Sequence, residues 1–89
     1  MKHIIKRKGH SEEYDSRKLY ASIYTSALAQ REPVRRAEAL SEEVCARAEH
    51  WLQNKHEITS NDLRMKAAEF LHDLDKDVGH KYLYHRVVW

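Results

Sequence analysis

Residues 4–19 read IIKRKGHSEEYDSRKL, and the change from strand to helix within this stretch decides the fold. Two short arms, IIKR and HSEEY, flank Lys8 and Gly9, and they have too few apolar residues at helical spacing to form a helix. Glycine tolerates the positive φ that a tight turn between antiparallel strands requires. Residues 3–14 are therefore predicted to form a small β-hairpin.

After the hairpin the apolar residues recur at helical spacing in four segments. Each of the first three follows a residue that suits the start of a helix: Asp15 or Ser16, Pro33, and Thr59 or Ser60. The first helix is expected to end near Gln30, and the fourth to follow Leu74 and continue almost to the end of the sequence. The apolar positions are Leu19, Tyr20, Ile23, Tyr24, Ala27 and Leu28; Val34, Ala37, Leu40, Val44, Ala48, Trp51 and Leu52; Leu63, Ala67, Phe70, Leu71 and Leu74; and Val78, Tyr82, Leu83 and Val87.

These elements predict an α-rich α+β fold, in which a small N-terminal β-hairpin caps a four-helix bundle. The connections are short, and a two-stranded hairpin is only marginally stable unless it packs on something else. The sequence has no repeat and no stretch rich in glycine, serine or proline. Residues 1–89 are therefore expected to form a single domain.

The composition restricts the compartment and the class of protein. The 89 residues include one cysteine, Cys45, which excludes a disulfide framework and suits a reducing compartment. No segment approaches the roughly 20 apolar residues of a membrane span. The start, MKHIIKRKG, has no apolar stretch of the kind found in a signal peptide. We expect a cytoplasmic protein that does not enter a membrane.

No catalytic constellation is found. The two glycines, Gly9 and Gly79, are too few for a P-loop or a Rossmann phosphate loop. The seven histidines form no HExxH motif, and no metal site is expected. Cys45 has no histidine or aspartate at a spacing that would activate it, so a half-buried structural thiol is expected. These observations predict a protein that is not an enzyme.

Positive charge is concentrated at the N-terminal end. The formal net charge is +2, and the first 20 residues contain six basic and three acidic side chains. An anion would be attracted to this end. Nucleic-acid binding is not expected, because Glu12, Glu13 and Asp15 interrupt the basic patch.

Three segments in order resemble the ATP-cone family. The first is residues 4–19, where Lys6, Arg7 and Gly9 match a Lys-Arg-Asp-Gly motif and Lys8 stands at the position of the aspartate. The second is ITSNDLR, residues 58–64, which is similar to the entry to the third helix of the family. The third is YLYHR, residues 82–86. Together these segments extend over nearly the whole sequence.

The resemblance implies a regulatory domain that binds ATP or dATP with Mg²⁺, as in ribonucleotide reductases and the reductase-gene repressor. Lys6, Arg7, Ser60 and Arg64 would meet the phosphates, Glu12, Asp15 and Lys18 would read the adenine and ribose, Ile4, Leu19 and Leu63 would line the base pocket, and Arg86 matches a recurrent basic residue of the last helix. Because successive residues of a strand point to opposite faces, Lys6 and Arg7 are not expected to contribute equally.

Two interpretations of the function follow. In the first, nucleotide occupancy alters self-association into a homo-oligomer or binding to a client protein. In the second, the pocket is degenerate and the fold is a helical protein–protein interaction domain that binds no nucleotide. The presence of Lys6, Arg7, Lys18 and Ser60 favours the first interpretation.

Overall fold

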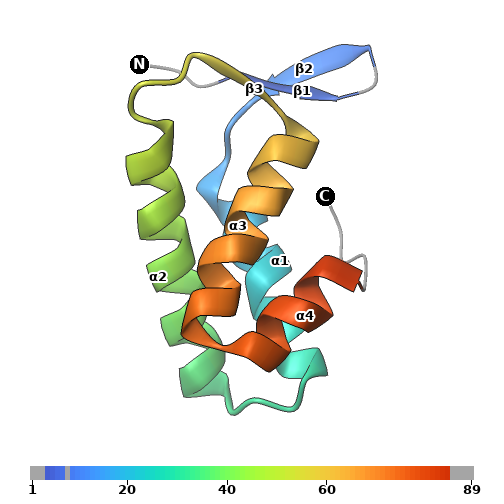
Figure 1. Ribbon diagram of the computed structural model, residues 1–89, viewed down its shortest axis with the longest axis vertical. Coiled ribbons are helices and arrows are strands. Elements are labelled where there is room, and N and C mark those ends of the chain that lie inside the picture. Colours follow the sequence, from blue (N-terminus) through green and yellow to red (C-terminus); the bar gives the residue numbers. More distant parts are fainter. Residues whose placement is uncertain (1–3, 8, 85–89) are drawn as a thin grey trace.

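The computed structural model describes residues 4–7 and 9–84, which form four helices and a three-stranded sheet at one end of them (Figure 1). The elements are β1 (Ile4–Arg7), β2 (His10–Glu13), α1 (Ser16–Ala29), α2 (Val34–Leu52), β3 (Glu57–Thr59), α3 (Ser60–Leu74) and α4 (Lys76–Tyr84). The predicted fold class is confirmed as helix-rich with a small sheet. The sheet has three strands and not the two that the sequence predicted.

The predicted hairpin is present. β1 and β2 pair antiparallel with Arg7 opposite His10, so two residues connect the strands. Gly9 has a φ of +85°, and a Cβ atom at this position would meet nothing within 4 Å. Glycine is therefore required here by the backbone conformation and not by a close contact.

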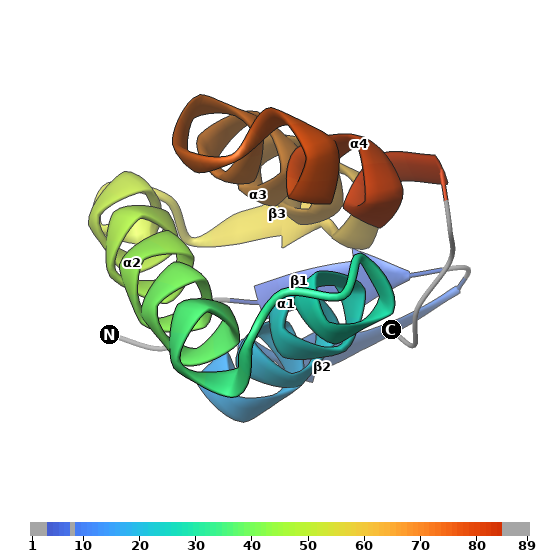
Figure 2. The same ribbon diagram turned by 90° about the horizontal axis from the view of Figure 1, so that it is seen from below.

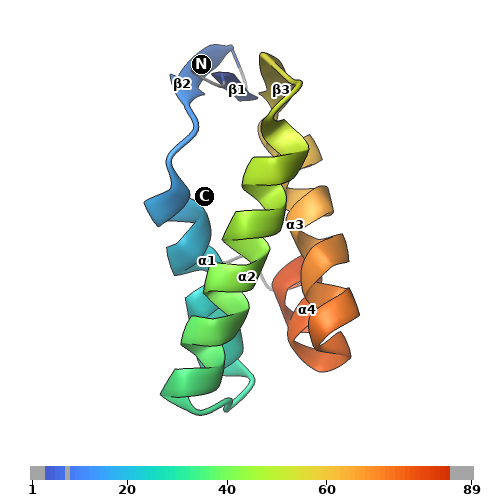
Figure 3. The same ribbon diagram turned by 90° about the vertical axis from the view of Figure 1, so that its left-hand side faces the viewer.

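The third strand, β3, was not predicted from the sequence. It pairs parallel to β1, with Ile5 opposite Ile58, and the sheet order is β2-β1-β3. Ile5 is buried and Ile58 packs against the same core, so this face of the sheet covers the helices (Figure 3). A three-residue strand is too short to show the alternation that identifies strands in a sequence.

The first and third helices begin where the sequence predicted. Asp15 caps α1 by accepting a hydrogen bond from the backbone N–H of Arg17 at 2.9 Å. Thr59 and Asp62 form a capping box at the start of α3, in which each side chain accepts a hydrogen bond from the backbone N–H of the other residue.

The second and fourth helices differ from expectation in detail. Pro33 is the N-cap of α2 and not part of its first turn, and Val34 is 53% exposed, so it does not belong to the core stripe. α4 has nine residues and ends at Tyr84 among the described residues; Val87 lies outside them. No helix in residues 4–7 and 9–84 is long and apolar enough to cross a membrane.

The helices pack in sequence order: α1 against α2, α2 against α3 and α3 against α4, and α4 also contacts α1 (Figure 2). α4 is short and inclined to the other helices (Figure 1), so the four-helix bundle stays a prediction. The core between these elements contains Ile5, Leu19, Ile23, Ala27, Ala37, Leu40, Val44, Cys45, Ala48, Leu63, Ala67, Ala68, Leu71, Val78 and Tyr82.

Candidate functional site

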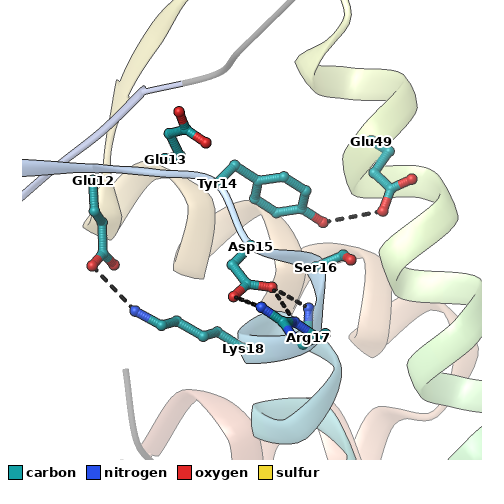
Figure 4. Close-up of a pocket in the computed structure, with 8 residues that line it drawn as sticks. All are labelled: Glu12, Glu13, Tyr14, Asp15, Ser16, Arg17, Lys18 and Glu49. Atoms are coloured by element: carbon teal, nitrogen blue, oxygen red, sulfur yellow. Dashed lines mark hydrogen bonds and ion pairs between the residues drawn. The ribbon is translucent and has the colours of Figure 1, made fainter.

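A pocket of about 450 Å³ opens where the hairpin leads into α1 and meets α2 (Figure 4). Its walls carry four carboxylates and two basic side chains, so it attracts hydrogen-bond donors and positive charge more than phosphate. The lining residues are Glu12, Glu13, Tyr14, Asp15, Ser16, Arg17, Lys18 and Glu49.

Glu12 and Lys18 form an ion pair at one edge of this pocket. Lys18 Nζ donates to Glu12 Oε2 at 3.1 Å, and both side chains remain partly exposed. Glu12 stands opposite Ile5 in the β1–β2 register, so it lies on the face of the sheet that covers the helices. Lys18 lies in the first turn of α1. A carboxylate and an ammonium group are thus held side by side, within reach of one small ligand.

Asp15 is held in its ionised form at the N-terminus of α1. The Arg17 guanidinium donates to both carboxylate oxygens at 3.2 Å, and the backbone N–H of Arg17 donates as well. These hydrogen bonds keep the pKa of Asp15 below its ordinary value. The carboxylate is therefore engaged by the backbone and the side chain of Arg17 in the first turn of α1.

The opposite wall of the pocket is formed by Tyr14 and Glu49. The Tyr14 hydroxyl donates to Glu49 Oε2 at 3.3 Å. This hydrogen bond joins the hairpin exit, the two residues between β2 and α1, to α2. Burial, and then the nearby Cys45 and Glu49, raise the pKa of Tyr14 well above its ordinary value. Cys45 Sγ lies 3.8 Å from the carbonyl oxygen of Ser16, and burial raises the pKa of Cys45 to about 11. Such a thiol is protonated at neutral pH and is not a nucleophile.

Lys6 lies on the other face of the sheet. It neighbours buried Ile5 in β1, and its Nζ pairs with Glu57 Oε1 of β3 at 3.3 Å. The structure therefore separates Lys6 from Glu12, which lies on the face of the sheet towards the helices, and from Lys18 of α1, which pairs with Glu12. Arg7 forms the end of β1 opposite His10, and Arg86 lies outside the described residues.

The start of α3 contributes a second group of predicted residues. Ser60 is the first residue of α3 and is partly exposed. Arg64, one turn further, donates from Nη1 to the carbonyl oxygen of Leu83 at 3.2 Å and from Nη2 to Asn61 Oδ1 at 3.3 Å. In this structure Arg64 therefore contacts the end of α4.

A comparison with protein-family profiles matches residues 2–88 to the ATP cone domain. This match covers essentially the whole sequence, as the resemblance of the three motifs suggested. The chain belongs to the ATP-cone family. An ATP-cone is a nucleotide-binding regulatory module. The comparisons with curated proteins and with solved structures found no significant match.

The structure brings together only part of the nucleotide site expected of an ATP-cone. Glu12, Asp15 and Lys18 share one pocket. Leu19 and Leu63 have no exposed surface because they are packed in the core, and Ile4 is partly buried on the same face as Lys6. A base pocket lined by these three side chains stays a prediction, and none of the three lines the pocket described above.

Sequence reasoning missed Glu49 and Arg17 as pocket residues. Glu38, Glu42, Cys45 and Glu49 recur at helical spacing on one side of α2, and this side contacts α1. That periodicity could have indicated that Glu49 faces the start of α1. Arg17 follows an N-cap aspartate directly, but no sequence pattern indicated that its side chain would fold back onto Asp15.

Proposed function

We propose that this ATP-cone binds ATP or dATP together with Mg²⁺, and that occupancy alters its self-association or its contact with a client protein. The observation that carries the proposal is the Glu12–Lys18 pair on the helix-facing side of the hairpin, beside Asp15. A carboxylate can accept a hydrogen bond from the adenine amino group, while an ammonium group can donate to a ring nitrogen or a ribose oxygen.

The phosphates are proposed to lie toward the turn of the hairpin and the start of α3. A helix N-terminus presents backbone N–H groups to anions, and Ser60 begins α3. Lys6, Arg7 and Arg86 are included in the proposed nucleotide site because the family resemblance implies them. Because Lys6 lies on the outer face of the sheet, away from the pocket that Lys18 lines, it is expected to contribute less than Lys18. Mg²⁺ would be held mainly by the nucleotide phosphates.

The regulatory role is proposed without a catalytic step. The family is a regulatory one, and the buried Cys45 thiol is protonated at neutral pH. A reducing, cytoplasmic location fits a lone buried thiol. The alternative is an interaction domain without nucleotide, and the two proposals differ in whether Mg²⁺-ATP binds at all.

Calorimetry with Mg²⁺-ATP at one fixed salt concentration tests the proposal. Lys18→Ala is expected to weaken binding about tenfold or more, because a hydrogen bond to a charged group contributes roughly 1.5–3 kcal/mol. Lys6→Ala is expected to weaken binding less than Lys18→Ala. Lys76→Ala is the matched control, since it removes the same charge at the start of α4, far from the sheet (Figure 1).

Two results would contradict the proposal. Wild-type protein that releases no heat with Mg²⁺-ATP and shows no amide shifts in residues 4–18 at millimolar nucleotide would favour the interaction domain. Equal affinities for wild type, Lys18→Ala and the double variant Lys6→Ala/Arg7→Ala would place the nucleotide elsewhere on the molecule.

A further inference from the structure

The sheet rests on α3 and is set apart from α1 and α2. β1 and β3 both pack against α3, whereas within residues 4–7 and 9–84 no Cα atom of α1 or α2 lies within 8 Å of a Cα atom in any strand. β2 leads to α1 through an extended segment that runs from the sheet to the helix (Figure 3). Contacts between side chains, together with this segment, therefore connect the hairpin to α1 and α2.

Two side-chain contacts join the hairpin and its exit to these helices, and they lie on opposite walls of the pocket (Figure 4). The first is the Glu12–Lys18 ion pair, at 3.1 Å, which ends on α1. The second is the hydrogen bond from the Tyr14 hydroxyl to Glu49 Oε2, at 3.3 Å, which ends on α2. A ligand that fills the pocket would touch both walls, so it would act on both contacts at once.

The Tyr14–Glu49 hydrogen bond is suited to respond to such a ligand. The Tyr14 ring packs against the core, which fixes the position of the ring, while the Glu49 side chain lies at the surface. A hydroxyl donor usually lies about 2.7–2.8 Å from its acceptor, so this bond is long and has room to shorten. One turn before Glu49, Cys45 Sγ lies 3.8 Å from the carbonyl oxygen of Ser16. Residues 45–49 of α2 therefore contact both the hairpin exit and the start of α1.

We propose that the Tyr14–Glu49 hydrogen bond is the contact through which a ligand in this pocket acts on α2. The carboxylates of the pocket suit hydrogen-bond donors, such as the amino group of a base, and a ligand held between the two walls brings the Tyr14 hydroxyl and Glu49 together. The sheet is then tied to α2 as well as to α3. The proposal rests on the nucleotide binding proposed above, and it adds the element that receives the signal, the C-terminal half of α2. Because coupling is reciprocal, loss of this bond also weakens binding of the ligand.

Amide hydrogen exchange of the ligand-free protein tests whether this bond ties the hairpin to α2. Tyr14→Phe keeps the ring and removes only the hydroxyl, so exchange in residues 10–13 should become about threefold faster or more, because one restraint on the hairpin is lost. Glu49→Ala should have the same effect, and the double variant should exceed neither single variant, since both remove one bond. Tyr24→Phe is the matched control, because it removes the hydroxyl of a half-buried tyrosine that stacks on Tyr20 further along α1. Unchanged exchange in residues 10–13 in either Tyr14→Phe or Glu49→Ala would overturn the proposal.

Addition of Mg²⁺-ATP tests whether the ligand uses this bond. In the wild type, saturating Mg²⁺-ATP should shift the amide resonances of residues 45–52 and slow exchange in residues 10–13 severalfold. Tyr14→Phe should bind Mg²⁺-ATP at least about threefold more weakly, and at saturation the resonances of residues 45–52 should keep their ligand-free positions. Tyr24→Phe should behave as the wild type does. Mg²⁺-ATP that binds without shifting residues 45–52, or that shifts them equally in Tyr14→Phe, overturns the inference and leaves the proposed function standing. If the wild type does not bind Mg²⁺-ATP, both proposals fall.

Discussion

Cys45 is a side chain whose chemistry is changed by its surroundings. It is 8% exposed, and it lies near Tyr14 and Glu49, where α2 meets the hairpin exit. Burial raises the pKa of this thiol from 9.0 to about 11, and the negative charge of Glu49 adds to the rise. The half-buried structural thiol expected from the sequence is thus found as a buried one.

This pKa predicts how stability changes at alkaline pH. Because the folded-state pKa is raised, the stabilisation is fully present below pH 9 and is lost as the pH rises through about 11. One such group can lower the free energy of unfolding by at most about 1.4 kcal/mol per pH unit. Urea unfolding between pH 7.5 and 10.5 should show this decline, and Cys45→Ala should make it shallower. The pKa of Tyr14 is also raised and acts in the same direction. The decline of the free energy of unfolding with pH should therefore be shallower still in the double variant Cys45→Ala/Tyr14→Phe. A wild-type stability that is constant over this range would contradict the burial of both groups.

Trp51 shows the limit of reading single residues from a periodic pattern. The helical stripe predicted a core residue, but the indole is only partly buried, with Lys55 Nζ 4.9 Å and Lys66 Nζ 6.0 Å from the ring centre. The pattern identifies the side of a helix that faces the core. It does not say whether a residue near the end of the stripe lies deep in the core, as Leu52 does, or at its rim, as Trp51 does.

At the scale of elements, α3 has the most completely capped start. The Thr59–Asp62 capping box satisfies two backbone N–H groups. Thr59→Ala is expected to lower the free energy of unfolding by about 0.5–2 kcal/mol. Thr25→Ala is the matched control: the Thr25 hydroxyl only bonds back to Ala21 O within α1, and its loss should change little. Chemical denaturation compares the two variants, and equal effects would show that the cap is not a stabilising contact.

The packing of α3 on α4 depends on Gly79. A Cβ atom here would lie 2.6 Å from the Cα of His72, so the two backbones would have to separate. Glycine to alanine normally stabilises a helix by up to about 1 kcal/mol. Overpacking of this kind costs about 1–3 kcal/mol, so Gly79→Ala should be destabilising on balance.

Thermal unfolding measures the sign of the Gly79→Ala effect. His80→Ala, at the exposed neighbouring position, is the control and should remain within about 0.5 kcal/mol of the wild type. A raised melting temperature for Gly79→Ala would show that helix propensity outweighs the contact with His72 and that the helices can move apart at little cost.

The helices could be predicted from the sequence because local signals determine them. Asp15 and Thr59 cap their helices through neighbouring residues, and the apolar stripes repeat over several turns. β3 could not be predicted, since its pairing with β1 depends on residues distant in the sequence. The site was predictable only in part for the same reason. The alternation of side chains along a strand predicts that Lys6 and Arg7 point to opposite faces of the sheet, but only the burial of Ile5 shows that Lys6 lies on the outer face.

For the whole molecule, the regulatory output is expected to be a change of surface. A bound polyphosphate would reduce the positive charge of the N-terminal end. Sedimentation over a wide range of protein concentration should therefore differ with and without Mg²⁺-ATP. The control is Lys18→Ala. Because this variant is expected to bind nucleotide more weakly, a higher concentration of Mg²⁺-ATP should be needed to change its sedimentation profile. Identical profiles would exclude a self-association switch and leave a client protein as the target.

The parallel pairing of β1 with β3 also sets the order in which the molecule can assemble. Ile4 pairs with Glu57, so more than half of the chain separates the two strands. During synthesis β1 leaves the ribosome before β3, and the edge of β1 that pairs with β3 stays unpaired until β3 follows. Long-range parallel pairing of this kind is slow to form, because the loop between the strands must close first. Formation of the α1–α2 pair brings the strands together, and we expect the sheet to be the last part of the domain to fold.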